Sequence, residues 1–301
     1  MNKTLDEIPG EEKLKDILEQ VASDRSRGSR EITAFLLEEL LVWCLELAES
    51  PGSRAIEKIC REIVSLRPEM AAVTNFGYLL WDRFSGQKME NVDKNFCSAL
   101  RELRARLEKA DENIINAAKK ANLNDHDVMS FSRSSTVLKL MLNSTNIEKS
   151  VVLHSYPGGE GIDLAEDLTE EIDVTFAYDV EAGYFLPKVD ALYMGADVLF
   201  EDGSVVNKTG SRLLARSSAE TPVRVVTDVW KLADGEVLSE VPRFPSPEVL
   251  PEKLKRNHPI FESVPGHLID TYITNMGVFE SLDKLLESTK ELQKAREKFC
   301  N

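Results

Sequence analysis

The stretch DALYMGADVLFEDGSVVNKTGS, residues 190–211, places a carboxylate and an ammonium where they could form a site for a small molecule. Asp197 ends an apolar run typical of a buried strand, and Lys208 follows Asn207 eleven residues later, before the start of an expected helix. Burial disfavours the charged form of a carboxyl group, which makes Asp197 a candidate general acid or base. Lys208 offers an ammonium to an anion. The alternative for Asp197 is a turn aspartate that bonds its own backbone.

Three other segments could bind an anion. SYPGGEGIDL, residues 155–164, is a glycine-rich turn in which backbone N–H groups could approach a ligand at a helix start. A second segment, SFSRSSTV at residues 130–137, offers hydroxyl groups and an arginine. A third, DRSRGSRE at residues 24–31, is a local basic patch, and the planar guanidinium groups of its arginines match the geometry of a phosphate. The alternatives are a tight turn, plain helix caps and solvated charge, respectively.

Two kinds of structure must position these candidates. The first 120 or so residues are typical of amphipathic helices interrupted by Pro and Gly, expected at 31–49, 53–66, 69–84 and in a long segment ending near 121. Beyond residue 123, helices alternate with short apolar strands expected at 127–132, 150–155, 173–178, 190–196 and 222–228. A last amphipathic helix is expected over 280–299.

This alternation predicts an α/β protein with two domains. Residues 1–122 form an N-terminal helical bundle, and residues 123–301 form a C-terminal Rossmann-like domain with a doubly wound, mainly parallel sheet. Such sheets bind ligands outside the carboxyl ends of their strands, which is where the candidate turns fall.

Composition narrows the classes of function. The 301 residues carry 37 Lys+Arg against 52 Asp+Glu, a net charge of −15, which argues against direct binding of nucleic acid or an anionic membrane. No run of 18 apolar residues and no apolar signal core occurs, so we expect a cytoplasmic protein. Four cysteines and four histidines lack zinc-site spacing, and no dinucleotide fingerprint is present. We therefore expect reduced thiols, no metal and no cofactor.

Together these segments resemble the translation initiation factor 2B alpha/beta/delta subunit family, which includes isomerases of ribose 1,5-bisphosphate and methylthioribose 1-phosphate. The strongest likeness is VDALYMGADVLFEDGSVVNKTGSRLLA. Further segments that resemble the family pattern are PVRVVTDVWKL, HSYPGGEG, SFSRSSTVL and FESVPGHLIDTYITNMGVF. The resemblance covers nearly the whole chain and is most specific over residues 130–279.

The resemblance implies a phosphosugar cleft between the two domains and a homodimer or higher homo-oligomer joined through the C-terminal domain. By this resemblance, Asp197 matches the position of the catalytic aspartate of the isomerases. The ligand-contacting positions that it implies are Arg27, Gly28, Ser29, Arg67, Ser134, Ser135, Thr136, Asn207, Lys208 and Lys231.

One departure from the family decides between two functions. Ser132 stands where the isomerases carry a catalytic cysteine, and a hydroxyl is far less acidic and nucleophilic than a thiol. The sequence therefore predicts a non-catalytic initiation factor 2B-like protein that binds a sugar phosphate or nucleotide, with an initiation factor 2 subunit as a further candidate partner. The alternative is an aldose–ketose isomerase of ribose 1,5-bisphosphate or methylthioribose 1-phosphate that uses Asp197.

Overall fold

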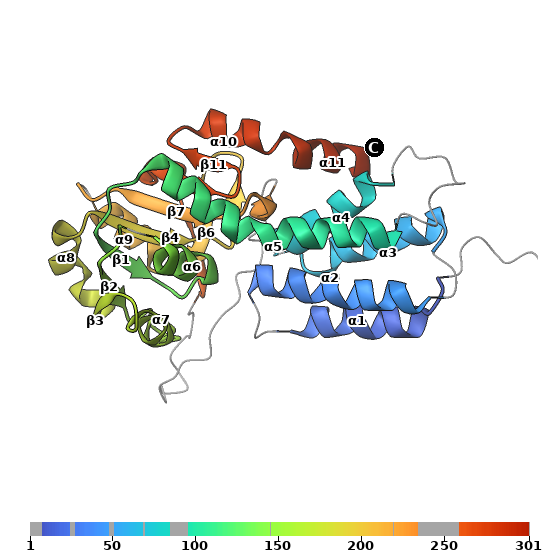
Figure 1. Ribbon diagram of the computed structural model, residues 1–301, viewed down its shortest axis with the longest axis horizontal. Helices are drawn as coiled ribbons and strands as arrows, with labels where there is room; N and C mark the ends of the chain where they lie inside the picture. The colour runs from blue at the N-terminus through green and yellow to red at the C-terminus, as the bar shows by residue number, and fades with distance from the viewer. Residues whose placement is uncertain are drawn as a thin grey trace, which may run out of the picture. The chain divides into compact units, whose positions relative to one another are not determined.

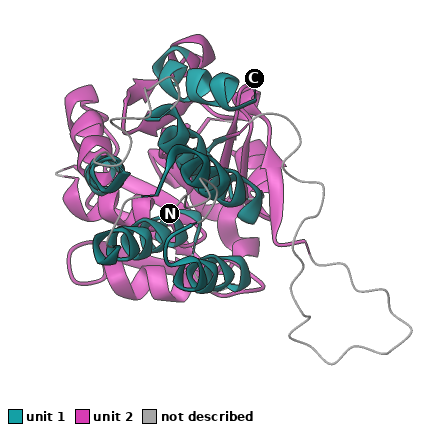
Figure 2. Ribbon diagram, turned by 90° about the vertical axis from the view of Figure 1, so that its right-hand side faces the viewer, with its two compact units in different colours: residues 1–110, 230–232, 287–301 teal, residues 111–229, 233–286 magenta. Residues whose placement is uncertain are grey.

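A computed structural model describes residues 8–24, 28–47, 51–68, 70–84, 96–144, 146–218, 220–233 and 259–300. Contacts divide the chain into two units, which Figure 2 shows in different colours. Unit 1 comprises residues 1–110, 230–232 and 287–301, and unit 2 comprises residues 111–229 and 233–286. The domain boundary expected after residue 122 stays a prediction.

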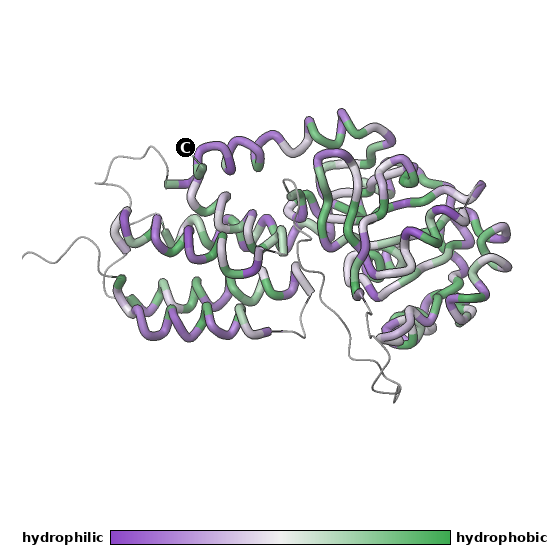
Figure 3. The backbone as a smooth tube through the Cα atoms, turned by 180° about the vertical axis from the view of Figure 1, so that it is seen from behind, coloured by the Kyte–Doolittle hydropathy of each residue, from purple (hydrophilic) through white to green (hydrophobic). Residues whose placement is uncertain are grey.

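Unit 1 is built from helices. They are α1 (Glu11–Ser23), α2 (Ser29–Glu46), α3 (Ser53–Leu66), α4 (Ala71–Asp82), the first part of α5 (Phe96–Ala121) and α11 (Lys290–Cys300). Hydrophobic and hydrophilic residues alternate along most of them, as Figure 3 shows, because these helices bury one side. Helix α4 differs, because none of its residues is exposed. Helix α3 has the bounds expected from the sequence and packs against α4, which also contacts α2 and α11. Helix α1 was not among the expected helices.

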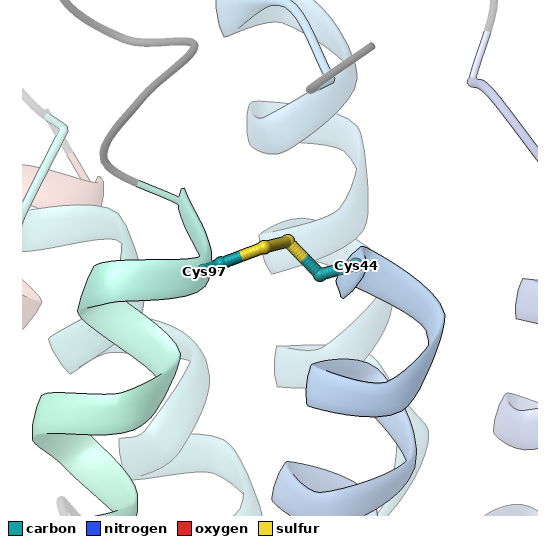
Figure 4. Close-up of a disulfide and its surroundings, with 2 residues drawn as sticks. All are labelled: Cys44 and Cys97. Carbon is teal, nitrogen blue, oxygen red and sulfur yellow. A yellow bond between two sulfur atoms is a disulfide. The ribbon is translucent and has the colours of Figure 1, made fainter. Parts of the chain in front are cut away.

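A disulfide links two helices of unit 1. Cys44, near the end of α2, is bonded to Cys97 in the first turn of α5, with 5.9 Å between their Cα atoms (Figure 4). The expectation that all four thiols are reduced was therefore wrong. The two cysteines lie 53 residues apart, and only the packing of the helices brings them together. Cys60 is a free thiol whose pKa is raised by burial, and Cys300 is free and exposed.

Seven of the described strands form one sheet in unit 2, in the order β11-β10-β7-β4-β1-β2-β3 (Figure 1). Their bounds are β1 (Asp127–Phe131), β2 (Lys149–Leu153), β3 (Asp173–Ala177), β4 (Ala191–Gly195), β7 (Val223–Thr227), β10 (Thr271–Thr274) and β11 (Gly277–Phe279). Every neighbouring pair is parallel except β10–β11. This confirms the α/β class with a parallel-dominated C-terminal sheet.

Helices cover the sheet because its strands are apolar. Ile114 of α5 packs with side chains of α6 (Ser135–Asn143) and α7 (Gly161–Leu168) on the strand residues Val128, Val152 and Val226. The remaining helical segments of unit 2 are α8 (Ala182–Phe185), α9 (Ser211–Ser217), α10 (Leu282–Ser288) and short 3-10 turns. A single helix was expected over 280–299. The structure has two helices instead, because the helix is interrupted at Thr289, between α10 and α11.

A second, smaller sheet follows the end of β4. Its order is β8-β5-β6-β9, with β5 (Val198–Phe200), β6 (Val205–Lys208), β8 (Leu232–Ala233) and β9 (Phe261–Val264). The hairpin of β5 and β6 turns the chain back, so that the Asp197 N–H donates to the Val206 carbonyl at 2.8 Å. The hairpin thereby brings Asp197 and Lys208, eleven residues apart in sequence, to the same end of β4.

None of the helices in the described part of the chain combines the length and apolarity that a membrane crossing requires.

Replacing both bridged cysteines, in Cys44→Ser with Cys97→Ser, is expected to lower the free energy of unfolding by about 4 kcal/mol. The reason is that the bridge closes a 53-residue separation and restricts the unfolded chain. Urea unfolding without reductant measures this loss, and Cys300→Ser is the control, expected to change stability by less than about 0.5 kcal/mol. Thiol titration of the unreduced, denatured chain should find the two free thiols, and four would contradict the bridge.

Candidate functional site

The candidate site lies at the carboxyl ends of β1 and β2 in unit 2, where two serines have unusual backbone geometry. Ser132 follows β1 with φ 66, and Ser155 follows β2 with φ 67. The Ser132 N–H donates to Ser155 Oγ at 2.8 Å, and that hydroxyl donates to the Leu153 carbonyl at 3.1 Å. Left-handed backbone at a non-glycine residue costs energy and is concentrated at functional sites. The two turns are therefore held together by the Ser155 side chain.

Asp179 fixes the second of these turns from the far side. Its two carboxylate oxygens accept the N–H groups of Ser155 and Tyr156, each at 2.7 Å. Asp179 follows β3, so the ends of the neighbouring strands β1, β2 and β3 are connected by hydrogen bonds from backbone N–H groups to side-chain oxygens. The two bonds to Asp179 are charge-assisted, and such bonds are shorter and stronger than neutral ones.

A carboxylate joins the serine to the lysine. Glu160 accepts the Ser132 hydroxyl at 3.1 Å, and its two oxygens accept hydrogen bonds from the Lys208 ammonium. The Lys208 side chain is only 4% exposed and that of Glu160 26%. Burying an ammonium costs several kcal/mol unless a counter-charge and hydrogen bonds compensate it. Glu160 supplies both, and it holds Lys208 at the end of β1.

The glycines of the turn after β2 allow this close approach. A Cβ on Gly158 would lie 2.3 Å from Glu160 Oε2 and 3.1 Å from Lys208 Nζ. A Cβ on Gly161 would lie 1.8 Å from the Leu153 carbonyl oxygen. The Gly161 distance is far shorter than any real Cβ contact and involves backbone, so this position requires glycine. A side chain at position 158 would displace the Glu160 carboxylate. Packing of the turn accounts for Gly161 without any anion bound there.

Asn207 and Lys208 point in different directions although they are adjacent. Successive side chains of a strand alternate between its two faces, and both residues lie in β6. Lys208 contacts Glu160, whereas the Asn207 amide donates to Ser211 Oγ at 2.9 Å and is 95% buried. In this structure Asn207 thus supports the start of α9. Contact of either residue with a ligand stays a prediction.

The expected donor turn lies beside the strand that ends at Asp197. Ser134 is the N-cap of α6 and accepts the Val137 N–H at 3.4 Å. A Cβ on Gly195 would lie 2.7 Å from Ser134, which shows how closely the helix start approaches β4. Ser135 begins α6 and Thr136 is buried in its first turn. The neighbouring Arg133 is paired with Asp167 at 2.8 Å.

The other predicted ligand residues belong to unit 1. Gly28 caps α2 and Ser29 is the first residue of that helix. The Arg67 guanidinium donates to the Val21 and Asp24 carbonyls at 3.1 and 2.7 Å, which anchors the end of α1. Lys231 lies in the short segment Val229–Lys231 and is buried. Arg27 lies outside the described residues. A ligand shared by these residues and Lys208 stays a prediction.

Glu160 was not among the residues expected at the site, although the turn that contains it was. The available signal was an acidic residue just before a helix-starting glycine, in a turn otherwise suited to an anion. Ser155 and Asp179 were missed too, because their roles depend on neighbouring strands. Among the described residues no group of three His, Cys, Asp or Glu side chains could hold a metal ion.

Comparison with known proteins places this chain in a family. The model of the initiation factor 2 subunit family matches residues 25–281. The chain belongs to this family. It is 25% identical over 281 residues to the ribose 1,5-bisphosphate isomerase of Archaeoglobus fulgidus, covering 88% of this chain and 89% of the relative. It is 26% identical over 273 residues to a translation initiation factor eIF-2B subunit 2-like protein of Pyrococcus furiosus, covering 89% and 96%.

A solved family structure shares the fold. The translation initiation factor eIF-2B of Pyrococcus horikoshii superposes with a TM-score of 0.74 at 23% identity, over 92% of this chain and 99% of that one. At this identity the likeness concerns the fold alone. The match of the family model to residues 25–281 confirms, at the level of the family, the resemblance found in the sequence.

A double-mutant cycle should measure the Glu160–Lys208 pair. Glu160→Gln alone is expected to destabilise the protein by about 3 kcal/mol, because it removes the carboxylate that faces a buried ammonium. The double variant with Lys208→Met should lose about 1–3 kcal/mol less unfolding free energy than the sum of the losses in the two single variants, as measured by urea unfolding. The exposed Lys149–Asp127 pair, at 3.6 Å, is the matched control and should show coupling below about 0.5 kcal/mol. Additive effects at Glu160 and Lys208 would contradict the pairing.

Proposed function

We propose that unit 2 binds a phosphorylated sugar and interconverts its aldose and ketose forms, with ribose 1,5-bisphosphate as the first candidate substrate. The observation that carries the proposal is the contact of Ser132, Glu160 and Lys208 at the end of β1. Membership of the initiation factor 2 subunit family and the likeness to a ribose 1,5-bisphosphate isomerase support the substrate class.

The reaction defines which groups are needed. As ribose 1,5-bisphosphate becomes the ketose, the bond between C1 and the ring oxygen breaks, and that oxygen gains a proton. The hydrogen on C2 moves to C1, and the C2 hydroxyl loses its proton as the carbonyl forms. One group must therefore give a proton and another must take one.

The polar residues at the strand ends can fill these roles. A serine alone is a poor acid or base, which is why the sequence favoured a non-catalytic protein. The contact with Glu160 gives the Ser132 hydroxyl a proton acceptor, so a proton from the C2 hydroxyl can pass through Ser132 to the carboxylate. Asp197, beyond β4, gives the proton to the ring oxygen in this proposal. Lys208 polarises the forming carbonyl, as positioned cations do.

The second candidate is a non-catalytic, ligand-binding member of the family that acts with an initiation factor 2 subunit. Two observations favour it: position 132 carries a hydroxyl, and Lys208 is already neutralised by Glu160. The two candidates share the ligand class and differ in turnover.

A coupled assay of ketose formation from ribose 1,5-bisphosphate separates them. Asp197→Asn and Glu160→Gln are each expected to lower turnover by about 10²–10⁴-fold, assayed at a temperature where both remain folded. Asp163→Asn, an exposed carboxylate in the first turn of α7, is the control and should keep full activity.

Ligand binding is measured in parallel by thermal shift, where a ligand at 100 times its Kd stabilises by about 2.7 kcal/mol. Binding without turnover would replace the isomerase by the second candidate. Absence of both with ribose 1,5-bisphosphate and methylthioribose 1-phosphate would overturn the phosphosugar site.

We also propose that the protein is a homodimer joined through unit 2 at residues 268–279. The family resemblance motivates this, and Met276, which precedes β11, is 54% exposed. Sedimentation at micromolar concentration should give a dimer, and Met276→Asp should weaken it, because a charge is costly in an apolar interface. A monomer for the unchanged chain would contradict the proposal.

A further inference from the structure

Exposed apolar side chains gather at one edge of the sheet of unit 2. Of the eleven large apolar side chains exposed in the described part of the chain, six lie within residues 156–184. Scattered single apolar residues are normal on a surface, but a contiguous group marks an interaction site. We call this group the edge patch; it comprises Tyr156, Ile162, Phe176, Tyr178, Val180 and Tyr184.

The aromatic centre of the edge patch is contiguous. The rings of Phe176 and Tyr178 lie 6.0 Å apart, and the His154 ring lies 6.1 and 5.8 Å from them. Tyr156 is tied to the same place, because its N–H donates to Asp179, next to Tyr178. Phe176 is 41% exposed and Tyr178 61%, so this ring cluster faces solvent rather than the core.

The aromatic centre of the edge patch lies in and next to a strand with one open side. β3 is the last strand of the seven-stranded sheet and pairs with β2 and with no other described strand (Figure 1). Asp173, Thr175 and Phe176 of this strand are all exposed. An edge strand offers a row of backbone N–H and C=O groups to any other extended chain.

The surroundings of the edge patch are strongly acidic. Residues 154–188 contain nine Asp and Glu residues and a single lysine. Within the described residues, Glu170, Glu171 and Asp173 are exposed and form no ion pair. A second copy of this chain would bring the same acidic segment and a net charge of −15, so self-association here is opposed by repulsion. A cationic partner is attracted.

We propose that the edge patch is a docking surface for an extended segment of another protein that alternates basic and apolar side chains and adds to β3 as a further strand. The backbone of the segment bonds to the open side of β3. Its apolar side chains cover Phe176 and Tyr178, and its basic side chains meet Glu170, Glu171 and Asp173. The inference is independent of the isomerase proposal, because it uses none of the residues placed in the reaction.

Three synthetic peptides test this on the full chain by isothermal titration. The first alternates Lys or Arg with Val and Phe, the second has Glu at every basic position, and the third is the basic peptide with N-methyl groups on alternate amides. The basic peptide should bind at least about ten-fold more tightly than either of the others, since it alone offers both charge and backbone donors. Equal binding of the basic and acidic peptides, equal binding of the N-methylated peptide, or no binding at all would overturn the proposal.

Variants locate the binding. Phe176→Ser with Tyr178→Ser should lower the affinity for the basic peptide by about ten-fold or more, as loss of central aromatic contacts does. Glu171→Lys should lower the affinity for the basic peptide and raise the affinity for the acidic one. Leu213→Ser is the matched control, because Leu213 is 70% exposed on α9, outside the edge patch, and should change nothing. An unchanged affinity in both edge variants, or sedimentation showing that the Phe176 and Tyr178 changes dissociate a self-associated form, would overturn the docking of a different protein.

Discussion

The requirement to compensate one buried ammonium organises the end of the sheet in unit 2. Lys208 enters from β6 and has almost no access to solvent, so a carboxylate must meet it inside the protein. Glu160 does this from the turn after β2, and the same carboxylate accepts the Ser132 hydroxyl beyond β1. The interaction therefore connects the large sheet with the small one. The backbone passes close by at Gly158, where a Cβ would lie 2.3 Å from Glu160 Oε2.

The elements that carry this interaction could be predicted, because their signals are local. Strands β1, β3 and β7 begin and end within a residue or so of the expected limits, and α3 has the expected limits. Apolar runs with period 2 or 3.6 need no knowledge of the rest of the chain. Family membership was recognisable for a similar reason, since the turn that contains Asp197 and Lys208 is contiguous in sequence.

What could not be predicted depends on contacts between distant segments. The pairing of Glu160 with Lys208 spans 48 residues, and the Cys44–Cys97 bridge spans 53. The sequence also does not show that the side chains of Asn207 and Lys208 point in different directions. Adjacent side chains of a strand lie on opposite faces, although the two residues form a pair in the sequence motif. Strands β9, β10 and β11 were not expected either, since each has four residues or fewer and little room for a pattern.

The path of the chain through the two units has a consequence for protein synthesis. Helix α11 belongs to unit 1, where it packs against α4, although it follows every other described helix in the sequence. All of unit 2 precedes residue 287. A chain emerging from the ribosome can therefore complete its β-sheet unit while the helical unit, begun first, still lacks a helix. Translation is usually expected to finish domains from the N-terminus onward. Here the order of completion is reversed, because the helices of unit 1 that are made first keep an uncovered apolar side until residues 287–301 have been synthesised.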